Sequence, residues 1–226
     1  MIYLLTLMLA FCSIVYELLL GQALSAFLGN TVLRYSVTIG LYMFSMGMGS
    51  LMAEGKLVKH SVTALLKVEI LLTVLGGFSV IFLMFFDAMG MSAVLFSVFA
   101  HALIMIIGVL TGFEIPLLMH LKRFESDHDE SLVLGVSYLG AFVGTVVFAF
   151  VLYPRMGLIP TAFFIALLNA AVGVALLTQA DKVQTSENQT FRGLIVVQLG
   201  LFFILMPCLL FSSSINELFL TYYLES

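Results

Sequence analysis

The sequence predicts an all-α protein, a polytopic transmembrane helix bundle of about seven spans. Three observations support this fold class: 62% of the 226 residues are hydrophobic, only 10% are charged, and the mean hydropathy is +1.17. Soluble domains carry roughly 25% charged residues, and one water-soluble core of this size could not bury so many apolar side chains. We therefore expect the chain to lie in a lipid bilayer. The membrane that we predict for it is the bacterial inner membrane.

Seven apolar runs have the length that a helix needs to cross the hydrocarbon core, roughly 20 residues. We treat residues 1–226 as one transmembrane domain and place its spans at residues 2–20, 35–53, 64–86, 91–118, 131–153, 158–177 and 193–211. The first run has no preceding basic residue and no small-residue cleavage site, so we expect it to stay in the membrane. The fourth is longer than required, which predicts tilting or a break. The runs do not alternate apolar with polar residues, as the strands of a membrane barrel would.

Charge and motifs exclude several classes of function. The formal net charge of -4 is spread over the predicted loops, so we expect no nucleic-acid partner. Cys12 and Cys208 fall inside apolar runs, where a thiol usually packs as a small hydrophobe. The sequence contains no phosphate-binding loop, no paired histidines and no nucleophile with a matching base. We predict no catalytic residue, no cofactor and no metal site, and these residues leave open whether the chain belongs to an enzyme.

The order of features in the first half of the chain recurs in the second half. Glu17 lies near the end of the first predicted span and is followed by Tyr35 and a Gly-containing run. Glu114 lies near the end of the fourth and is followed by Tyr138 and another Gly-containing run. We interpret spans one to three and four to six as two copies, with span seven added. Since three crossings is an odd number, the copies would form an inverted repeat, as in many secondary transporters. Chance similarity between apolar segments is the alternative.

Glu17 and Glu114 are the side chains that we expect to carry function. A carboxylate within an apolar span is costly to insert, so it usually faces the bundle interior and pairs, protonates or binds something. Pro116 predicts a kink or break in the helix that would free a backbone carbonyl beside Glu114, and the two together could hold a cation. An inverted repeat would place the two acids near opposite membrane faces. The alternative is that each acid hydrogen-bonds a neighbouring helix or reaches the interface.

Two tyrosines complete the candidate substrate-binding set. Tyr35 and Tyr138 hold matching places in the two proposed copies. A tyrosine ring can attract a cation through its face, and Tyr42 could act with Tyr138 in this way. Tyrosines also pack or anchor helices at the membrane interface, which is the alternative role for all three.

Small and polar residues elsewhere in the spans predict helix packing. Gly108 with Gly112, and Gly140 with Gly144, form GxxxG pairs that let helices approach closely. Asn169 and Gln198 are expected to form hydrogen bonds between helices. Lys67 and Glu69, at the start of the third predicted span, are expected to anchor it at the interface.

Several short motifs resemble the membrane domain of spermidine synthase-like proteins. They are Tyr16-Glu17-Leu18-Leu19, Met46-Gly47-Met48-Gly49-Ser50, Glu114-Ile115-Pro116, Ser137-Tyr138-Leu139-Gly140 and Leu152-Tyr153-Pro154-Arg155. The family pattern often has an acidic residue before the tyrosine, where this chain has Ser137, so any charge-based role of the fifth span is in doubt.

The resemblance implies a partner and a class of ligand. In such proteins a multi-spanning domain is often followed by a soluble aminopropyltransferase-like domain, and the segment after Ile215 looks like the connector that would lead into one. The implied function is to bind or transport a polyamine-like organic cation, or to present a membrane substrate to an aminopropyltransferase domain or partner. The alternative is a non-transporting anchor or assembly module for a synthase.

Overall fold

The computed structural model describes residues 2–53, 60–121, 127–183 and 185–225, and every regular element in these ranges is a helix. The predicted all-α class is therefore confirmed. The α-helices are α1 (Ile2–Leu28), α2 (Thr31–Met52), α4 (Ser61–Gly77), α5 (Ser79–Ala88), α6 (Ala93–Leu121), α7 (Asp127–Val147), α8 (Tyr153–Met156), α9 (Leu158–Ala175) and α10 (Asn188–Glu225). A π-helix, η1 (Phe148–Leu152), joins α7 to α8, and two 3₁₀ segments, η2 (Leu176–Lys182) and η3 (Thr185–Glu187), precede α10.

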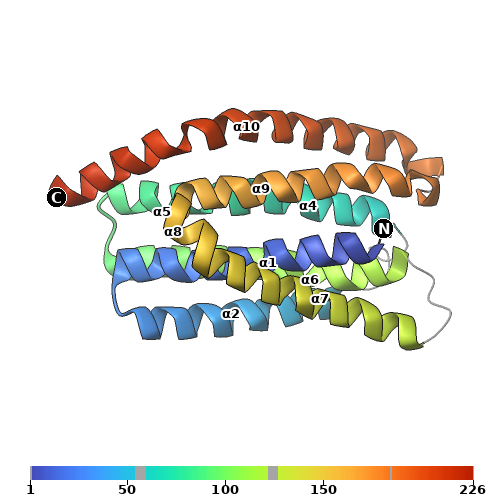
Figure 1. Ribbon diagram of the computed structural model, residues 1–226, viewed down its shortest axis with the longest axis horizontal. Helices are drawn as coiled ribbons and strands as arrows, with labels where there is room; N and C mark the ends of the chain where they lie inside the picture. Colours follow the sequence, from blue (N-terminus) through green and yellow to red (C-terminus); the bar gives the residue numbers. More distant parts are fainter. Residues whose placement is uncertain (1, 54–59, 122–126, 184, 226) are drawn as a thin grey trace.

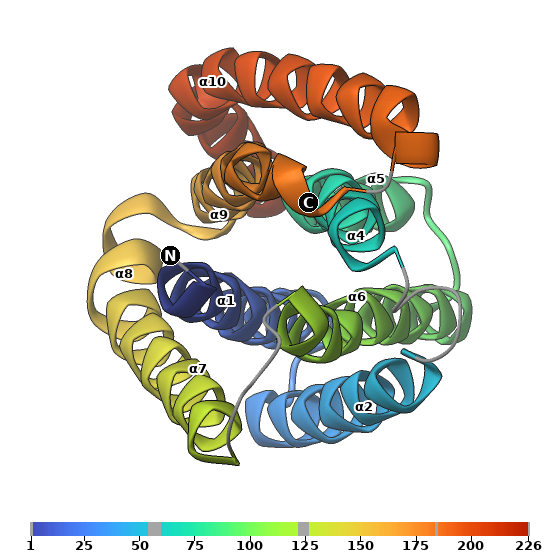
Figure 2. The same ribbon diagram turned by 90° about the vertical axis from the view of Figure 1, so that its right-hand side faces the viewer.

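The helices lie side by side along the long axis of the molecule, with the two chain ends at opposite ends of the bundle (Figure 1). Seen along the helices, α1 and α6 occupy the middle, α2 and α7 lie on one side, and α4, α9 and α10 lie on the other (Figure 2). The contacts agree, because α1 packs against α2, α6, α7 and α9, while α10 packs mainly against α9 and α4. The central position of α1 and α6 places the two proposed functional acids inside the bundle.

The first helix extends further than the sequence predicted. It continues to Leu28 because its polar residues Gln22 and Ser25 still allow helical geometry, and it ends where Gly29 and Asn30 take positive φ values of 66° and 51°. The Asn30 side chain then accepts a hydrogen bond from the Leu33 amide at 3.4 Å and caps α2. Glu17 consequently lies near the middle of α1 and not in its last turns.

One bend separates α4 from α5, whereas α6, which was expected to kink or break, is continuous. α4 and α5 meet at Phe78 with a bend of 41°, just after the Gly76-Gly77 pair. The predicted break at Pro116 is wrong, because α6 continues through it to Leu121. Tight packing explains this continuity, since Leu117, Leu118 and Leu121 are all buried after the proline.

Apolar helices long enough to cross a membrane make the chain a membrane protein by composition. Five stretches qualify within the described residues: 2–28, 93–121, 130–156, 158–181 and 188–212. The bent pair α4 and α5 would make a sixth. α2 does not qualify, because glycine, serine, threonine and tyrosine residues along its whole length lower its hydropathy. The division into seven spans therefore stays a prediction.

Candidate cation pocket

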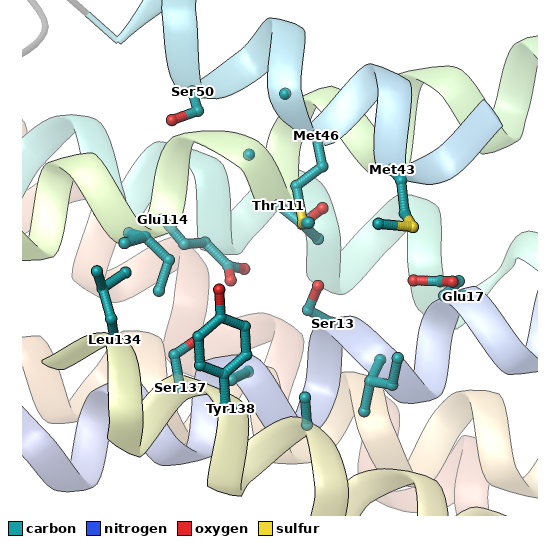
Figure 3. A pocket seen from close by; sticks show the side chains of 16 residues that line it. Ser13, Glu17, Met43, Met46, Ser50, Thr111, Glu114, Leu134, Ser137 and Tyr138 are labelled. Atoms are coloured by element: carbon teal, nitrogen blue, oxygen red, sulfur yellow. The ribbon is translucent and has the colours of Figure 1, made fainter. Parts of the chain in front are cut away.

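A pocket of about 360 Å³ lies between four helices, α1, α2, α6 and α7 (Figure 3). This volume is within the range of small-molecule sites in proteins. Its lining residues are Ala10, Ser13, Ile14, Glu17, Met43, Met46, Gly47, Ser50, Thr111, Gly112, Glu114, Ile115, Leu134, Ser137, Tyr138 and Ala141. The pocket therefore joins the first two helices of one proposed copy to the first two of the other.

Both acids singled out from the sequence line this one pocket. Glu17 reaches it from α1 and Glu114 from α6, and Figure 3 shows their carboxylates on either side of Ser13. The side chains are 7% and 2% exposed, respectively. The expectation that the two acids lie near opposite membrane faces is therefore wrong. The longer α1 explains the difference, because it moves Glu17 toward mid-helix and level with the pocket.

The Glu114 carboxylate is incompletely satisfied. Its Oε1 is buried, and no described residue donates a hydrogen bond to it. An unpaired carboxylate oxygen removed from water is energetically costly unless a proton or a cationic group compensates it. The position of Glu114 at the pocket wall gives such a group a place to bind.

The other polar groups of the pocket are neutral. They are the hydroxyls of Ser13, Ser50, Thr111, Ser137 and Tyr138, and no described Lys, Arg or His lines the wall. Ser13 is held by Tyr42, whose buried hydroxyl donates to the Ser13 carbonyl at 3.1 Å. Two carboxylates facing neutral hydroxyls, without a described basic partner, favour a cationic occupant.

Methionine and tyrosine side chains form the outer wall. Met43 on α2 and Tyr138 on α7 are both largely exposed, Tyr138 at 75%. Both helices lie on the same side of the central pair α1 and α6 (Figure 2). The exposed side chains of Met43 and Tyr138 therefore place the outer edge of the pocket between α2 and α7. A tyrosine face and thioether groups suit the methylenes and ammonium groups of an organic cation.

Glycines bring the four walls together. A side chain at Gly108 or Gly112 would meet the carbonyl oxygen of Tyr42 or Met46 on α2. On the other side of the pocket, a side chain at Gly140 or Gly144 would meet the α1 backbone, at the Leu7 and Phe11 carbonyls respectively. Only glycine permits backbone contact this close, so the two GxxxG pairs position α2 and α7 on the central helices.

Pro116 contributes to the same wall although it does not break α6. A proline has no amide N–H, so Pro116 cannot donate the helical hydrogen bond to the carbonyl of Gly112, four residues earlier. Gly112 and Glu114 both line the pocket. The lost backbone bond therefore falls at the pocket wall, next to the buried acid.

Tyr35 does not join the other candidates. Its hydroxyl donates to Gln22 Oε1 at 2.5 Å, and Gln22 Nε2 donates to the Tyr153 hydroxyl at 2.7 Å. This set ties together α1, α2 and α8 beyond the pocket, and its contacts are those of a structural bridge. Of the four proposed substrate-binding residues, the structure brings three together: Glu17, Glu114 and Tyr138.

Sequence reasoning missed one buried acid. Glu69 on α4 is 0% exposed, so its predicted role as an interfacial anchor is wrong. The available signal was helical geometry: residues two positions apart point to opposite sides of a helix, and here Lys67 is exposed while Glu69 is buried. Asn169, in contrast, forms the predicted interhelical hydrogen bond, to the Glu69 carbonyl at 3.1 Å.

Comparison with known proteins identifies relatives of one kind. The polyamine aminopropyltransferase of Leptospira interrogans is 37% identical over 179 residues, which are 77% of this chain and 34% of that protein. Polyamine aminopropyltransferase 2 of Ralstonia nicotianae is 36% identical over 73% of this chain and 32% of its own length. The polyamine aminopropyltransferase of Oceanobacillus iheyensis is 31% identical over 74% of this chain and 33% of its own length.

These matches relate the chain to one region of polyamine aminopropyltransferases. The chain spans about a third of the length of each of these relatives. No family model matches it, and no solved structure matches it. The resemblance drawn from the sequence motifs is supported to this extent: polyamine aminopropyltransferases are homologues of this chain, and the part that they share with it has the apolar helices of a membrane protein.

Proposed function

We propose that this chain is the membrane domain of an aminopropyltransferase-like protein and that its pocket binds a polyamine-like organic cation. One observation carries the proposal: Glu17 and Glu114, both buried, line the same pocket, and the other described polar groups on its wall are neutral. The names of the relatives supply the ligand class, since all those described above are polyamine aminopropyltransferases.

The chemistry of a polyamine matches the wall. Its ammonium groups are separated by short methylene chains, so it needs separated anionic contacts with apolar surface between them. Glu17 and Glu114 offer the anionic contacts, while Ile14, Met43 and Met46 offer apolar surface. Charge-assisted hydrogen bonds of ammonium groups to buried carboxylates are stronger than those between neutral groups. A bound polyamine would then either cross the membrane or be presented to an aminopropyltransferase domain or partner.

An inverted repeat would account for the two-sided pocket. The helix contacts are exchanged between the halves: α1 packs against α7 and α9, while α6 packs against α2 and α4. Figure 1 also draws α1 and α6 running in opposite directions. These features support two copies related by a two-fold axis, which in transporters places the ligand site at their interface. We further propose the bacterial inner membrane as the location, because the apolar elements are helical and the relatives are bacterial.

A binding measurement tests the proposal. Spermidine binding to the purified full chain in nanodiscs is measured by calorimetry for the wild type, Glu17→Gln and Glu114→Gln. A hydrogen bond to a charged group contributes about 1.5–3 kcal/mol, so each variant should weaken binding roughly 10- to 100-fold. Asp181→Asn is the matched control, because Asp181 is exposed and outside the pocket, and it should bind like the wild type.

The alternative is a non-transporting anchor for a synthase. It predicts no saturable spermidine binding to the wild type, or equal binding in all four proteins, and either result would remove the pocket assignment. If binding is confirmed, uptake of labelled spermidine into proteoliposomes distinguishes transport from presentation.

A further inference from the structure

A second buried polar cluster lies on the other side of the bundle, where α4, α9 and α10 meet. Asn169 Nδ2 donates to the Glu69 carbonyl at 3.1 Å and to Thr73 Oγ1 at 3.4 Å. Gln198 Nε2 donates to Thr73 Oγ1 and to the Ala170 carbonyl, both at 3.3 Å. All four side chains, those of Glu69, Thr73, Asn169 and Gln198, are 0% exposed.

The cluster contains acceptor oxygens that receive no hydrogen bond from its donors. Both Glu69 carboxylate oxygens, Asn169 Oδ1 and Gln198 Oε1 are buried and have no hydrogen-bond partner among the described residues. Each such atom is costly to bury unsatisfied, and a native interior rarely keeps several together. These four oxygens belong to residues that already share one hydrogen-bond network, so a single bound species could serve them.

The direction of the two amide groups is fixed by their contacts. Asn169 and Gln198 each donate from nitrogen to a backbone carbonyl, Glu69 in one case and Ala170 in the other. A carbonyl oxygen can only accept, so exchanging the oxygen and nitrogen of either amide would destroy these bonds. The amide oxygens are therefore the unsatisfied atoms, and the surplus of acceptors is not a result of amide orientation.

The packing around Gln198 keeps this arrangement in place. A side chain at Gly173 on α9 would lie 2.5 Å from Gln198 Nε2 and 2.8 Å from its Cδ. Glycine at this position gives the amide space to enter between α9 and α10. The cluster is thus formed by side chains of three helices, and Gly173 leaves the space that Gln198 occupies.

We propose that this cluster is a binding site for a small monovalent metal cation, with sodium as the ligand to test. A proton on Glu69 could satisfy one neighbouring acceptor, whereas a metal cation can coordinate several oxygens at once. The site offers one carboxylate together with amide oxygens, which balances a single positive charge. Divalent ions usually take more carboxylates, and transition metals favour nitrogen or sulfur ligands.

Thermal unfolding of the full chain in detergent micelles tests this site without reference to the polyamine pocket. Sodium chloride is titrated against N-methyl-D-glucamine chloride at constant ionic strength. A ligand that binds only the folded state raises the unfolding midpoint, and at tenfold excess over its Kd the rise for a chain of this size is roughly 3–6 °C. The wild type should show this saturable rise, and Glu69→Gln should abolish it.

Asp181→Asn removes an exposed carboxylate and should keep the full sodium effect. Binding of radioactive sodium at one ion per chain, lost in Glu69→Gln, gives a readout that does not depend on stability. The proposal would be overturned if sodium did not raise the unfolding midpoint of the wild type. This includes the case in which the midpoint rises only when the pH is lowered. A Glu69→Gln variant that folds and still responds to sodium would also overturn it.

Discussion

The contact between α2 and α6 gives the sharpest prediction about the architecture of the pocket. A methyl group at Gly112 would collide with the Met46 carbonyl oxygen and would lie 2.9 Å from the Met46 carbonyl carbon and Cα. These neighbours are backbone atoms, so no change of rotamer can relieve the collision. Gly112→Ala must therefore push the two helices apart.

The loss of stability in Gly112→Ala can be worked out from these distances. Ordinary van der Waals contact begins near 3.4 Å. The collision with the carbonyl oxygen therefore requires a separation of about 1 Å, and a gap of this size forfeits up to about half of the dispersion energy of the atoms that lose contact. Overpacking of this kind costs about 1–3 kcal/mol of folding free energy. Because Met46, Thr111 and Gly112 all line the pocket, spermidine binding should weaken together with stability.

Unfolding by increasing mole fractions of SDS in mixed micelles measures the change. Gly40→Ala is the matched control, since Gly40 also lies in α2 but a methyl group there would have no neighbouring atom within 4 Å among the described residues. There the substitution should be neutral or stabilise by up to about 1 kcal/mol, through the lower backbone entropy of alanine. Equal stability of Gly112→Ala and Gly40→Ala would refute the close α2–α6 contact.

Three further predictions concern individual side chains. Tyr16→Phe should leave the stability unchanged or raise it by about 1 kcal/mol, because the buried Tyr16 hydroxyl has no hydrogen-bond partner among the described residues; a clear loss in SDS unfolding would mean that the hydroxyl has one. Tyr138→Phe should keep spermidine affinity, while Tyr138→Ala should weaken it about 2- to 5-fold through loss of a cation–π contact of about 0.5–1 kcal/mol, and calorimetry that finds both variants equal would exclude that contact. Gln22→Leu should lower stability by about 1–2 kcal/mol, because it removes two hydrogen bonds, yet leave spermidine affinity unchanged; a large loss of affinity would extend the site to Tyr35.

The sequence was sufficient for the fold class and for two of the functional candidates. Long apolar runs have few structural solutions in a membrane other than helices, so composition alone predicts the bundle. The same physics singles out Glu17 and Glu114, because a carboxylate in an apolar run requires compensation. Neither composition nor the cost of a buried carboxylate tells which helices are neighbours, so the sequence could not show that both acids share one pocket.

The misplaced residues have specific physical causes. Tyr35 matches Tyr138 in sequence order, but its partner is Gln22, and no periodicity predicts a hydrogen bond between particular side chains. Glu69 was assigned to the interface because it lies at the start of the third predicted span, but the helix turns its side chain into the bundle while that of Lys67 stays exposed. The break expected at Pro116 is absent because packing of the following leucines outweighs one missing backbone hydrogen bond.

The most direct test of the polyamine pocket is to locate the bound cation. A spermidine derivative carrying a diazirine is photolysed on the full chain in nanodiscs, and the labelled peptides are identified by mass spectrometry. We predict labelling of the α2 segment with Met43 and Met46 and of the α7 segment with Tyr138, suppressed by excess spermidine and lost when Glu17 and Glu114 are both changed to Gln. Labelling elsewhere, or labelling that persists in this double variant, would contradict the assignment of the pocket.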